Sequence, residues 1–279
     1  FVSPRSLPIW QIHAPVVEAL RSGNRLVLVA PTGSGKTTQV PQMLLDDGLA
    51  GDKKIVVLQP RRVAARTVAA RVAWERGCPL GAEIGYQIRF DDQTSLGTRI
   101  SYVTEGSLLR WLQADPTLSE LSVVLFDEFH ERNLLSDVAL ALVKRLQRTE
   151  RLDLNLAVMS ATLEAEPVAE YLDDSGGGAE TPILRSEGQS FPVEVRYLNQ
   201  PDERPITEQA ADLVEQILQS GEPGDILVFM PGMAEINATI SAARAIRSPE
   251  HLAVIPLHGD LTPEQQDLAF APNSLRKVV

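Results

Sequence analysis

A glycine-rich turn that follows an apolar run constrains this chain more than any other feature. The run "RLVLVA" (25–30) leads into "PTGSGKTT" (31–38), and a helical pattern begins there. Glycines let the backbone turn so that several N–H groups point inward, and these groups bind phosphate oxygens together with the positive end of the following helix. The segment therefore predicts a phosphate-binding loop between a strand and a helix.

The loop follows the pattern GxxxxGK(S/T), with Ala30 in the first position in place of glycine. In this pattern Lys36 would reach the β- and γ-phosphates, and Thr37 would ligate Mg²⁺. ATP and Mg²⁺ are therefore the expected cofactors. A Gly/Ser-rich turn with an incidental lysine is the alternative, and the strand before the loop and the helix after it disfavour that alternative. The expected nucleotide-binding residues of the loop are Gly33, Ser34, Gly35, Lys36, Thr37 and Thr38.

Short β-branched runs alternate with amphipathic helical patterns along the chain. Near-continuous apolar strands are typical of parallel sheets covered on both faces, and their alternation with helices predicts a doubly wound α/β fold. We expect two such units, at residues 1–188 and 189–279, the second incomplete because it stops within a strand. The expected strands are 25–30, 54–60, 99–105, 122–128, 155–162, 225–232, 252–260 and 277–279, and the expected helices are 62–77, 136–149, 206–220, 234–246 and 262–271.

Two residues are expected to shape helices of the first unit. Ser136 is a good N-cap for the helix at 136–149, because its hydroxyl oxygen can accept a hydrogen bond from the first helical turn. Pro41 falls early in the helix after the phosphate loop, where proline is expected to kink or strain the backbone.

Charged residues crowd the end of another expected strand, "SVVLFDE" (122–128). A phosphate loop needs an acidic partner for Mg²⁺, and ligands of open α/β sheets bind at the carboxyl ends of strands. Asp127 ends its strand in this way and would hold the metal, usually through water. Glu128 would orient and polarise the attacking water, and His130 would have a coupling role. The alternatives are a solvated pair of carboxylates and a turn histidine with a local partner.

Charge is distributed unevenly along the chain. The net charge is −11, which disfavours nucleic-acid binding over the whole surface. Residues 1–90, however, carry 12 Lys and Arg against 6 Asp and Glu, whereas the remaining residues carry 14 against 31. A nucleic-acid contact is therefore expected in the first third. The single cysteine, Cys78, fits a reducing, cytoplasmic location, and no apolar run approaches the roughly 20 residues of a membrane helix.

Eight motifs stand in the order and spacing of the superfamily 2 DExH-box helicases, and the chain resembles that family over nearly its whole length. Five of them are "GSGKTT" (33–38), "QPRRVAAR" (59–66), "TEG" (104–106), "DEFH" (127–130) and "SAT" (160–162). Three more resemble the DEAH/RHA branch: "GYQIRFDD" (85–92), "FMPGMAEI" (229–236) and "LHGDL" (257–261). The combination of "FDEFHERNL" with "EGQSFPVEVRYL" (187–198) is most similar to bacterial HrpB-type helicases.

The resemblance implies two RecA-like (P-loop NTPase) domains, with ATP in the cleft between them and a single strand of RNA across both. Ser160 and Thr162 would link the nucleotide site to the RNA track. Arg71 and Phe270 would stack on the nucleotide base, so that other nucleoside triphosphates are accepted as well. Without the resemblance, the two hydroxyl residues would be interpreted as a helix cap and Phe270 equally well as a core residue. The residues that would contact RNA are Arg61, Arg62, Arg89, Thr104, Glu105, Gly106, His258 and Gly259.

Some of the expected RNA contacts have a plainer alternative. The arginines could belong to a solvated basic surface, and His258 could simply close a loop.

One departure from the family concerns the end of the chain. The family's next two motifs would follow "RKVV" (276–279), and the last would carry an arginine finger worth about 10³–10⁵ in rate. The chain is therefore expected to bind nucleotide but to hydrolyse it poorly.

The expected function is that of an ATP-dependent RNA helicase or RNP-remodelling translocase, an NTP hydrolase that moves along single-stranded nucleic acid, with room for a protein activator. Two alternatives stay open: a DNA-directed superfamily 2 motor, and a non-hydrolysing ATP-binding scaffold that binds RNA. The expectation that the bound strand is RNA and not DNA rests on the resemblance alone. The intact loop lysine and strand-end carboxylates disfavour the scaffold, because a retired ATPase has no chemical need for a water-positioning carboxylate.

Overall fold

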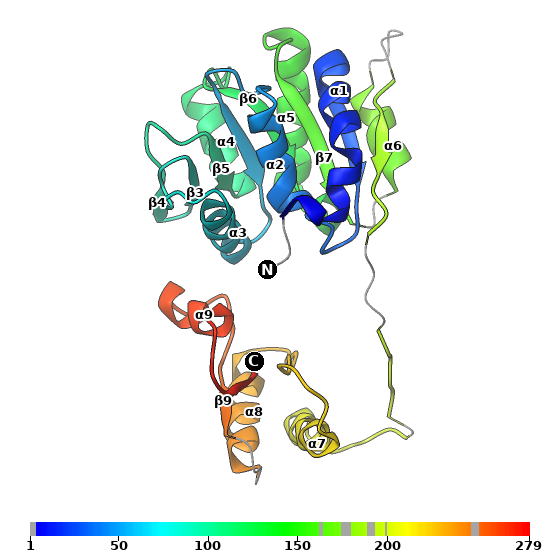
Figure 1. The fold of residues 1–279 in the computed structure, drawn as a ribbon, viewed down its shortest axis with the longest axis vertical. Helices are drawn as coiled ribbons and strands as arrows, with labels where there is room; N and C mark the ends of the chain where they lie inside the picture. The colour runs from blue at the N-terminus through cyan, green and yellow to red at the C-terminus, as the bar shows by residue number, and fades with distance from the viewer. Residues whose placement is uncertain (1–3, 162–163, 174–179, 189–192, 199, 247–250) are drawn as a thin grey trace. The chain divides into compact units, whose positions relative to one another are not determined.

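The chain folds into two separate units, Phe1–Phe191 and Pro192–Val279 (Figure 1). The computed structural model describes residues 4–161, 164–173, 180–188, 193–198, 200–246 and 251–279. Each unit is described by itself below. In these ranges no helix combines the length and the apolar character needed to cross a membrane.

An eight-stranded sheet forms the centre of the first unit. Its strands are β1 (Arg25–Val29), β2 (Lys54–Leu58), β3 (Ile84–Ile88), β4 (Asp91–Gln93), β5 (Ile100–Val103), β6 (Leu121–Phe126), β7 (Asn155–Ser160) and β8 (Ile183–Arg185). In space their order is β4-β3-β5-β2-β6-β7-β1-β8. Neighbouring strands are parallel except β3 and β4, which form an antiparallel hairpin. The crossovers and parallel pairing confirm the predicted α/β fold.

Helices cover both faces of this sheet, which explains why its strands are apolar on both sides. One face packs against α1 (His13–Gly23), α2 (Lys36–Asp46) and α3 (Arg62–Glu75), and the other against α4 (Glu105–Ala114), α5 (Leu134–Thr149) and α6 (Ala165–Leu172). Three short 3₁₀ helices are η1 (Pro4–Ser6), η2 (Pro8–Ile12) and η3 (Phe129–Glu131). Within β1, Leu26 and Leu28 join the first apolar cluster and Val27 joins the second.

The parallel strands end at one common edge of the sheet, and the motif residues follow there. The glycine-rich loop follows β1, Gln59 follows β2, Thr104 follows β5, Asp127 follows β6, and Ser160 ends β7. Because β6, β7 and β1 are successive neighbours, only one strand separates the loop from the acidic residue. Ligands of open α/β sheets bind at this edge, so the strand order itself brings the predicted site residues together.

Pro41 lies inside α2, yet the helix continues through it from Lys36 to Asp46. Proline has no N–H, so the carbonyl oxygen four residues earlier, that of Thr37, loses its helical partner. The hydroxyl of Tyr102 donates to this oxygen at 3.1 Å, and the Tyr102 side chain is fully buried. The hydrogen bond that Pro41 removes is therefore replaced by one from β5.

The start of α5 differs from the prediction. Ser136 is not the N-cap: the helix begins at Leu134, and its cap is Asn133, whose side chain accepts a hydrogen bond from the Ser136 N–H at 2.9 Å. Asn and Ser are comparably good caps, so residue preference alone does not separate the two positions. Ser136 instead donates its hydroxyl to the buried carboxylate of Glu105 at 2.8 Å, which ties α5 to α4.

The second unit contains a small parallel sheet and helices. Its described elements are α7 (Ile206–Ser220), α8 (Met233–Ala245), β9 (Leu252–Val254), α9 (Pro263–Phe270) and β10 (Arg276–Val278). The strand predicted at 225–232 is reduced to one bridge between Ile226 and Val278, with a further hydrogen bond from the Val228 N–H to the Val279 carbonyl. The strand prediction at 225–232 was therefore wrong in length, because only the segment around Ile226 and Val228 pairs with β10 and the residue after it.

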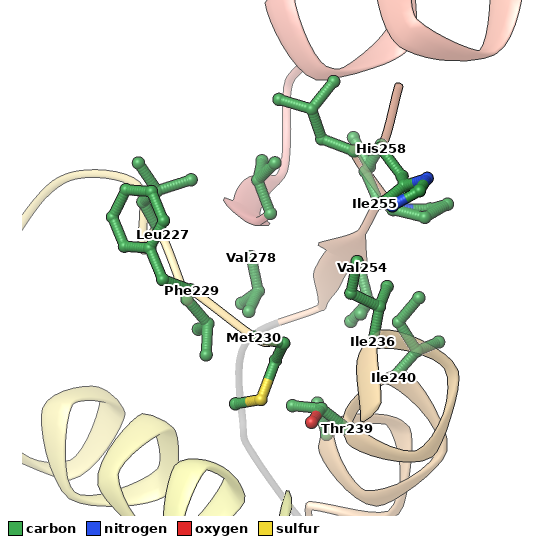
Figure 2. Close-up of a pocket in the computed structure, with 15 residues that line it drawn as sticks. Leu227, Phe229, Met230, Ile236, Thr239, Ile240, Val254, Ile255, His258 and Val278 are labelled. Carbon is green, nitrogen blue, oxygen red and sulfur yellow. The ribbon is translucent and has the colours of Figure 1, made fainter. Parts of the chain in front are cut away.

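An apolar hollow of about 180 Å³ lies within the second unit. Figure 2 shows the side chains around it, which include Leu227 and Phe229 before α8, Val254 of β9 and Val278 of β10. Thr239 of α8 also lines the hollow, and its hydroxyl is buried without a hydrogen-bond partner in the described part of the chain. The small sheet thus leaves apolar surface that the described residues do not cover.

Replacing Tyr102 with phenylalanine should destabilise the chain by about 1–3 kcal/mol, because the Thr37 carbonyl loses its hydrogen bond. The cost should largely disappear in the presence of Pro41→Ala, since alanine restores an N–H four residues after Thr37. Urea unfolding of the single and double variants measures this coupling. Tyr171→Phe is the matched control, because Tyr171 is nearly half exposed, and it should change stability by less than about 0.5 kcal/mol. Equal losses in both backgrounds would contradict the role given to Tyr102.

Candidate active site

The turn between β1 and α2 has the geometry of an anion-binding loop. Gly33 and Gly35 take left-handed backbone conformations, with φ of 82° and 95°, which residues with a side chain reach only under strain. A β-carbon on Gly35 would also lie 2.9 Å from Cδ1 of Leu7. Lys36 begins α2, so the loop ends at the positive end of an 11-residue helix.

The ammonium of Lys36 meets the acidic end of β6. Lys36 is almost fully buried, and its Nζ donates to Oε1 of Glu128 at 2.8 Å. A buried cation requires a paired anion, because desolvation of an unpaired charge is costly. The contact confirms the spatial expectation drawn from the sequence, that the glycine-rich loop and the acidic strand end share one place.

Asp127 is buried in the same place and accepts several hydrogen bonds. Gln59 Nε2 donates at 2.6 Å and the Glu128 N–H at 2.9 Å. Burial raises the pKa of the Asp127 carboxyl above its usual value, and the nearby Lys36 ammonium and Thr37 hydroxyl oppose part of this rise. A loop hydroxyl and a strand-end carboxylate therefore lie close together, as two ligands of one metal ion must.

Gln59 is a site residue that is not among the predicted ones, although it begins the motif "QPRRVAAR" (59–66). It follows β2, which is hydrogen-bonded to β6, so its side chain reaches the acid at the end of the neighbouring strand. The signal in the sequence is a polar residue directly after a buried strand, next to Arg61 and Arg62. Gln59 is itself almost fully buried, and its amide holds one oxygen of the Asp127 carboxylate in a set direction.

Glu128 joins the phosphate loop to a histidine and a serine. Its backbone is left-handed, with φ of 50°, a strained conformation of the kind that clusters at functional sites. Besides its contact with Lys36, Glu128 has its second oxygen 3.4 Å from Nδ1 of His130, which lies 3.2 Å from the Ser160 hydroxyl. These contacts cross from the loop after β1 to the ends of β6 and β7. Thr162, the second expected coupling residue, lies outside the described residues.

A pocket of about 280 Å³ is open beside the loop. Ser34, also expected to bind nucleotide, is buried instead, and its hydroxyl has no hydrogen-bond partner in the described part of the chain. Leu7 and Glu75 line the pocket although no motif points to them. The lining residues that the sequence predicts are Gly33, Gly35, Lys36, Thr37, Thr38, Arg71 and Glu128.

The arginines expected to contact nucleic acid are exposed. Arg61 caps the start of α3 and Arg62 is its first residue. Arg61 is not a free cation, because its Nη2 lies 3.1 Å from Oε1 of Glu131, next to the acidic strand end. Arg89 lies in the turn between β3 and β4, with its guanidinium carbon 4.7 Å from the centre of the Phe90 ring.

The three residues expected at the start of α4 have different environments. Thr104 is the N-cap residue and Gly106 lies in the first turn, and both are partly exposed. Glu105 is buried, and its Oε1 accepts the Ser136 hydroxyl at 2.8 Å. The carboxylate of Glu105 therefore fastens α4 to α5 and does not line an exposed track, which corrects that part of the expectation.

Three expected site residues belong to the second unit. Phe270 ends α9 and is half exposed, which removes the alternative that it is a core residue within this unit. His258 accepts the Asp260 N–H on Nδ1 at 3.2 Å, and the adjacent Gly259 is exposed. A loop-closing role for His258 is thus present, and the proposed contacts of these residues with nucleotide or RNA stay predictions.

The residues present fit a magnesium ion. Mg²⁺ prefers oxygen ligands, keeps several waters and needs only one or two protein ligands beside substrate phosphates. The Thr37 hydroxyl and the Asp127 carboxylate, which lie close together, are such oxygens. Throughout the described ranges no group of three or more His, Cys, Asp or Glu is arranged to hold a metal, so a site built entirely from protein ligands is not seen there.

The raised pKa of Asp127 predicts a specific pH dependence in metal-free buffer. The unfolded chain ionises this carboxyl near its usual value of 3.8, while the folded chain keeps the proton to higher pH. The folded state thus binds more protons in that interval, and this group's contribution to stability should fall as pH rises through it. Asp127→Asn has no ionisable group at this position. As pH rises, its free energy of unfolding should therefore increase relative to that of the unmodified chain. Urea unfolding in EDTA between about pH 4 and 8 measures this, and a constant difference would contradict the raised pKa.

Comparison with known proteins places this site in a family. The model of the DEAD/DEAH box helicases matches residues 10–171. The chain is 42% identical to the probable ATP-dependent RNA helicase DHR2 of Saccharomyces cerevisiae, over 98% of the chain and 38% of that protein. It is 39% identical to the human probable ATP-dependent RNA helicase DHX35, over 99% of the chain and 41% of that protein. The chain thus spans about two fifths of the length of these relatives.

Solved structures agree with the sequence comparison. The crystal structure of the Escherichia coli DEAH/RHA helicase HrpB matches with a TM-score of 0.84 and 39% identity, over 98% of this chain and 34% of that one. A second structure of E. coli HrpB, described as a DExH-box NTPase, matches with a TM-score of 0.73 and the same identity. The chain therefore belongs to the DEAD/DEAH box helicase family.

Proposed function

We propose that this chain is the motor portion of an ATP-dependent RNA helicase or RNP-remodelling translocase. The observation that carries the proposal is the contact of the buried Lys36 with the acidic pair Asp127 and Glu128 at the carboxyl edge of a parallel sheet. Arg61 and Thr104 follow other strands at this edge, so a nucleic acid bound there would lie beside the nucleotide. The names of the relatives, both RNA helicases, support RNA as the bound strand.

Lys36 and Glu128 would exchange partners when a nucleotide binds. Phosphate oxygens in the loop would accept hydrogen bonds from the Lys36 ammonium, which now donates to Glu128. The released carboxylate of Glu128 would then be available to orient an attacking water and accept its proton. The exchange is physically reasonable because the lysine remains paired with an anion before and after it.

Thr37 and Asp127 would hold Mg²⁺, which would supply neutralisation of charge on the phosphates. The chain's own part is to present these two oxygens together, and the amide of Gln59 and the N–H of Glu128 keep the Asp127 carboxylate oriented. Because burial raises the pKa of Asp127, the cation and Lys36 would favour the ionised form that binding requires.

His130 and Ser160 would transmit the change at Glu128 to the nucleic-acid track. His130 lies within 3.4 Å of the carboxylate and within 3.2 Å of the Ser160 hydroxyl. A shift of the Glu128 side chain toward water would therefore remove one neighbour of the histidine ring. Ser160 ends β7, next to the segment that the family pattern relates to coupling.

Four further properties are proposed: the use of several nucleoside triphosphates, a cytoplasmic location, a bacterial source and a protein activator. Stacking of Arg71 on a base would be tolerant of base identity, which supports use of several nucleoside triphosphates. The single cysteine supports a cytoplasmic location, and the likeness to E. coli HrpB supports a bacterial source. A protein activator is proposed from the family resemblance alone.

Glu128→Gln should lower the ATP turnover number by about 10²–10⁴, because the amide cannot accept a proton from water. The dissociation constant for ATP should change little, since Lys36 and the loop are retained. A phosphate-release assay and a binding titration separate the two quantities. Glu120→Gln is the matched control: Glu120 is an exposed carboxylate paired with Lys54 at the opposite end of the strands, and its loss should leave turnover unchanged.

The nucleic-acid partner is tested by comparing stimulation of ATP hydrolysis by single-stranded RNA and by single-stranded DNA of the same sequence. RNA stimulation that disappears in Glu128→Gln supports the proposal. Stimulation by DNA alone would favour the DNA-directed motor. ATP binding with a turnover that neither nucleic acid stimulates and that Glu128→Gln does not lower further would favour the scaffold. Turnover that survives Glu128→Gln would remove the role given to that carboxylate.

Arg61→Ala and Arg62→Ala should each weaken binding of single-stranded RNA irrespective of its sequence, because their expected contacts are to phosphates. Each lost contact should reduce the slope of log affinity against log salt by about 0.7. Fluorescence anisotropy over a salt series measures both effects. Arg145 is an exposed arginine near the C-terminal end of α5, away from the ends of the strands that carry the site. Arg145→Ala should therefore leave the slope unchanged. A reduction of the slope equal to that of Arg61→Ala would indicate a non-specific effect of charge.

A further inference from the structure

Glu75, the last residue of α3, is a buried carboxylate at the nucleotide pocket that none of the steps above uses. Its side chain is 4% exposed, although the residue lines the pocket. One oxygen accepts Nε of Arg71 at 2.7 Å, and the other accepts Nε2 of Gln39 at 2.8 Å and Nε2 of Gln42 at 3.0 Å. Resting on the proposed nucleotide binding, we propose that Glu75 is a positioning residue that holds Arg71 ready for the base and so makes the site prefer nucleotides to bare polyphosphates.

The hydrogen bonds of Glu75 require a carboxylate. Both oxygens are acceptors, and all three contacting groups are donors. Glutamine at this position would accept on one side only, and its own NH₂ group would face either the arginine or the two amides. A buried carboxylate with three complementary donors has one favourable orientation. The same hydrogen bonds therefore fix the orientation of Glu75 and the orientations of Arg71, Gln39 and Gln42.

Arg71 is the partner whose freedom Glu75 removes. Its side chain is 52% exposed, and a long exposed arginine would otherwise sample many rotamers. Glu75 holds Nε, and the guanidinium carbon lies 4.8 Å from the centre of the Trp74 ring. A guanidinium held at its edge and by an aromatic ring keeps its plane in one direction, and stacking on a base needs such a plane. The entropy of ordering Arg71 is then lost on folding and not on nucleotide binding.

Glu75 also connects the base end of the pocket to the phosphate end. Gln39 and Gln42 lie on α2, the helix that begins at Lys36, whereas Arg71 lies on α3. Gln39 further accepts Nε1 of Trp10 at 3.3 Å. One carboxylate thus fixes the spacing of the two helices that carry the phosphate loop and the arginine, and a nucleotide must match that spacing.

The charge of Glu75 would oppose nucleotide binding if it were left alone. A buried carboxylate beside a triphosphate repels it, and the Arg71 guanidinium compensates that charge. The pair therefore adds little net attraction for phosphates, and its benefit should appear only when the ligand has a base. Comparison of ATP with inorganic tripolyphosphate separates these two contributions, because tripolyphosphate has the phosphates and no base.

The test measures the dissociation constants of ATP and of tripolyphosphate, both with Mg²⁺, by calorimetry on the 279-residue chain. In Glu75→Gln the preference for ATP over tripolyphosphate should fall about 3- to 10-fold, the range of a lost cation–π contact. Loss of the Glu75 charge should strengthen binding of the phosphates in both ligands alike, so that it cancels in this ratio. Arg71→Lys, which keeps the charge but not the plane, should give the same loss. The double variant should lose no more than either single variant, because Glu75 acts through Arg71.

Glu83→Gln is the matched control, because Glu83 pairs with Arg76 at 2.6 Å and lies outside the pocket. Its preference for ATP should be that of the unmodified chain. An unchanged preference in Glu75→Gln, an equal loss for both ligands, or a further loss in the double variant would overturn the proposal. If Glu75→Gln does not fold by circular dichroism, Glu75→Asp replaces it, since the shorter carboxylate keeps the charge but withdraws from Arg71. Failure of the unmodified chain to bind ATP would instead overturn the proposed function.

Discussion

The burial of the Lys36 ammonium against the carboxylates that follow β6 is the interaction on which the rest of the site depends. A buried cation is tolerated only when anions and hydrogen-bond partners surround it, and Glu128 at 2.8 Å is its observed partner. The cost of burial explains why the surrounding shell is polar and ordered, with Gln59 donating to the carboxylate of Asp127. The same shell suits a triphosphate and its metal ion. The triphosphate can replace Glu128 as the anion beside Lys36, and the metal ion can replace Lys36 as the cation beside Asp127.

The sheet supplies the rigidity that this charge set needs. Parallel strands covered by helices on both faces present all their carboxyl ends at one edge, so loops distant in the sequence become neighbours without long connections. The helices behind that edge are locked by buried polar contacts. Tyr102 satisfies the carbonyl that Pro41 leaves free, and Glu75 joins α2 to α3. These contacts limit movement of the loop and of Arg71, which Glu75 holds through its Nε.

Prediction from the sequence succeeded where one local pattern carries the chemistry. The run of glycines before Lys36 predicts the loop and the helix after it, and both are present. Prediction was weaker where two residues compete for one role, as with Asn133 and Ser136, or where a strand depends on its neighbour, as at 225–232. Glu105 shows a third case, since a residue of a functional motif serves to pack α4 against α5. Residue type does not reveal burial, which depends on what lies opposite.

By itself the sequence determined the chemical inventory: a phosphate loop, an acidic strand end, a family membership and a parallel α/β fold. Only the tertiary structure decided which members of that inventory touch. The pairing of Lys36 with Glu128 spans 92 positions, and the contact of Gln59 with Asp127 spans 68. Such contacts follow from the spatial order of the strands, which is a non-local property. The hydrophobic pattern of a strand indicates that the strand is buried. The pattern does not indicate which other strands are its neighbours in the sheet.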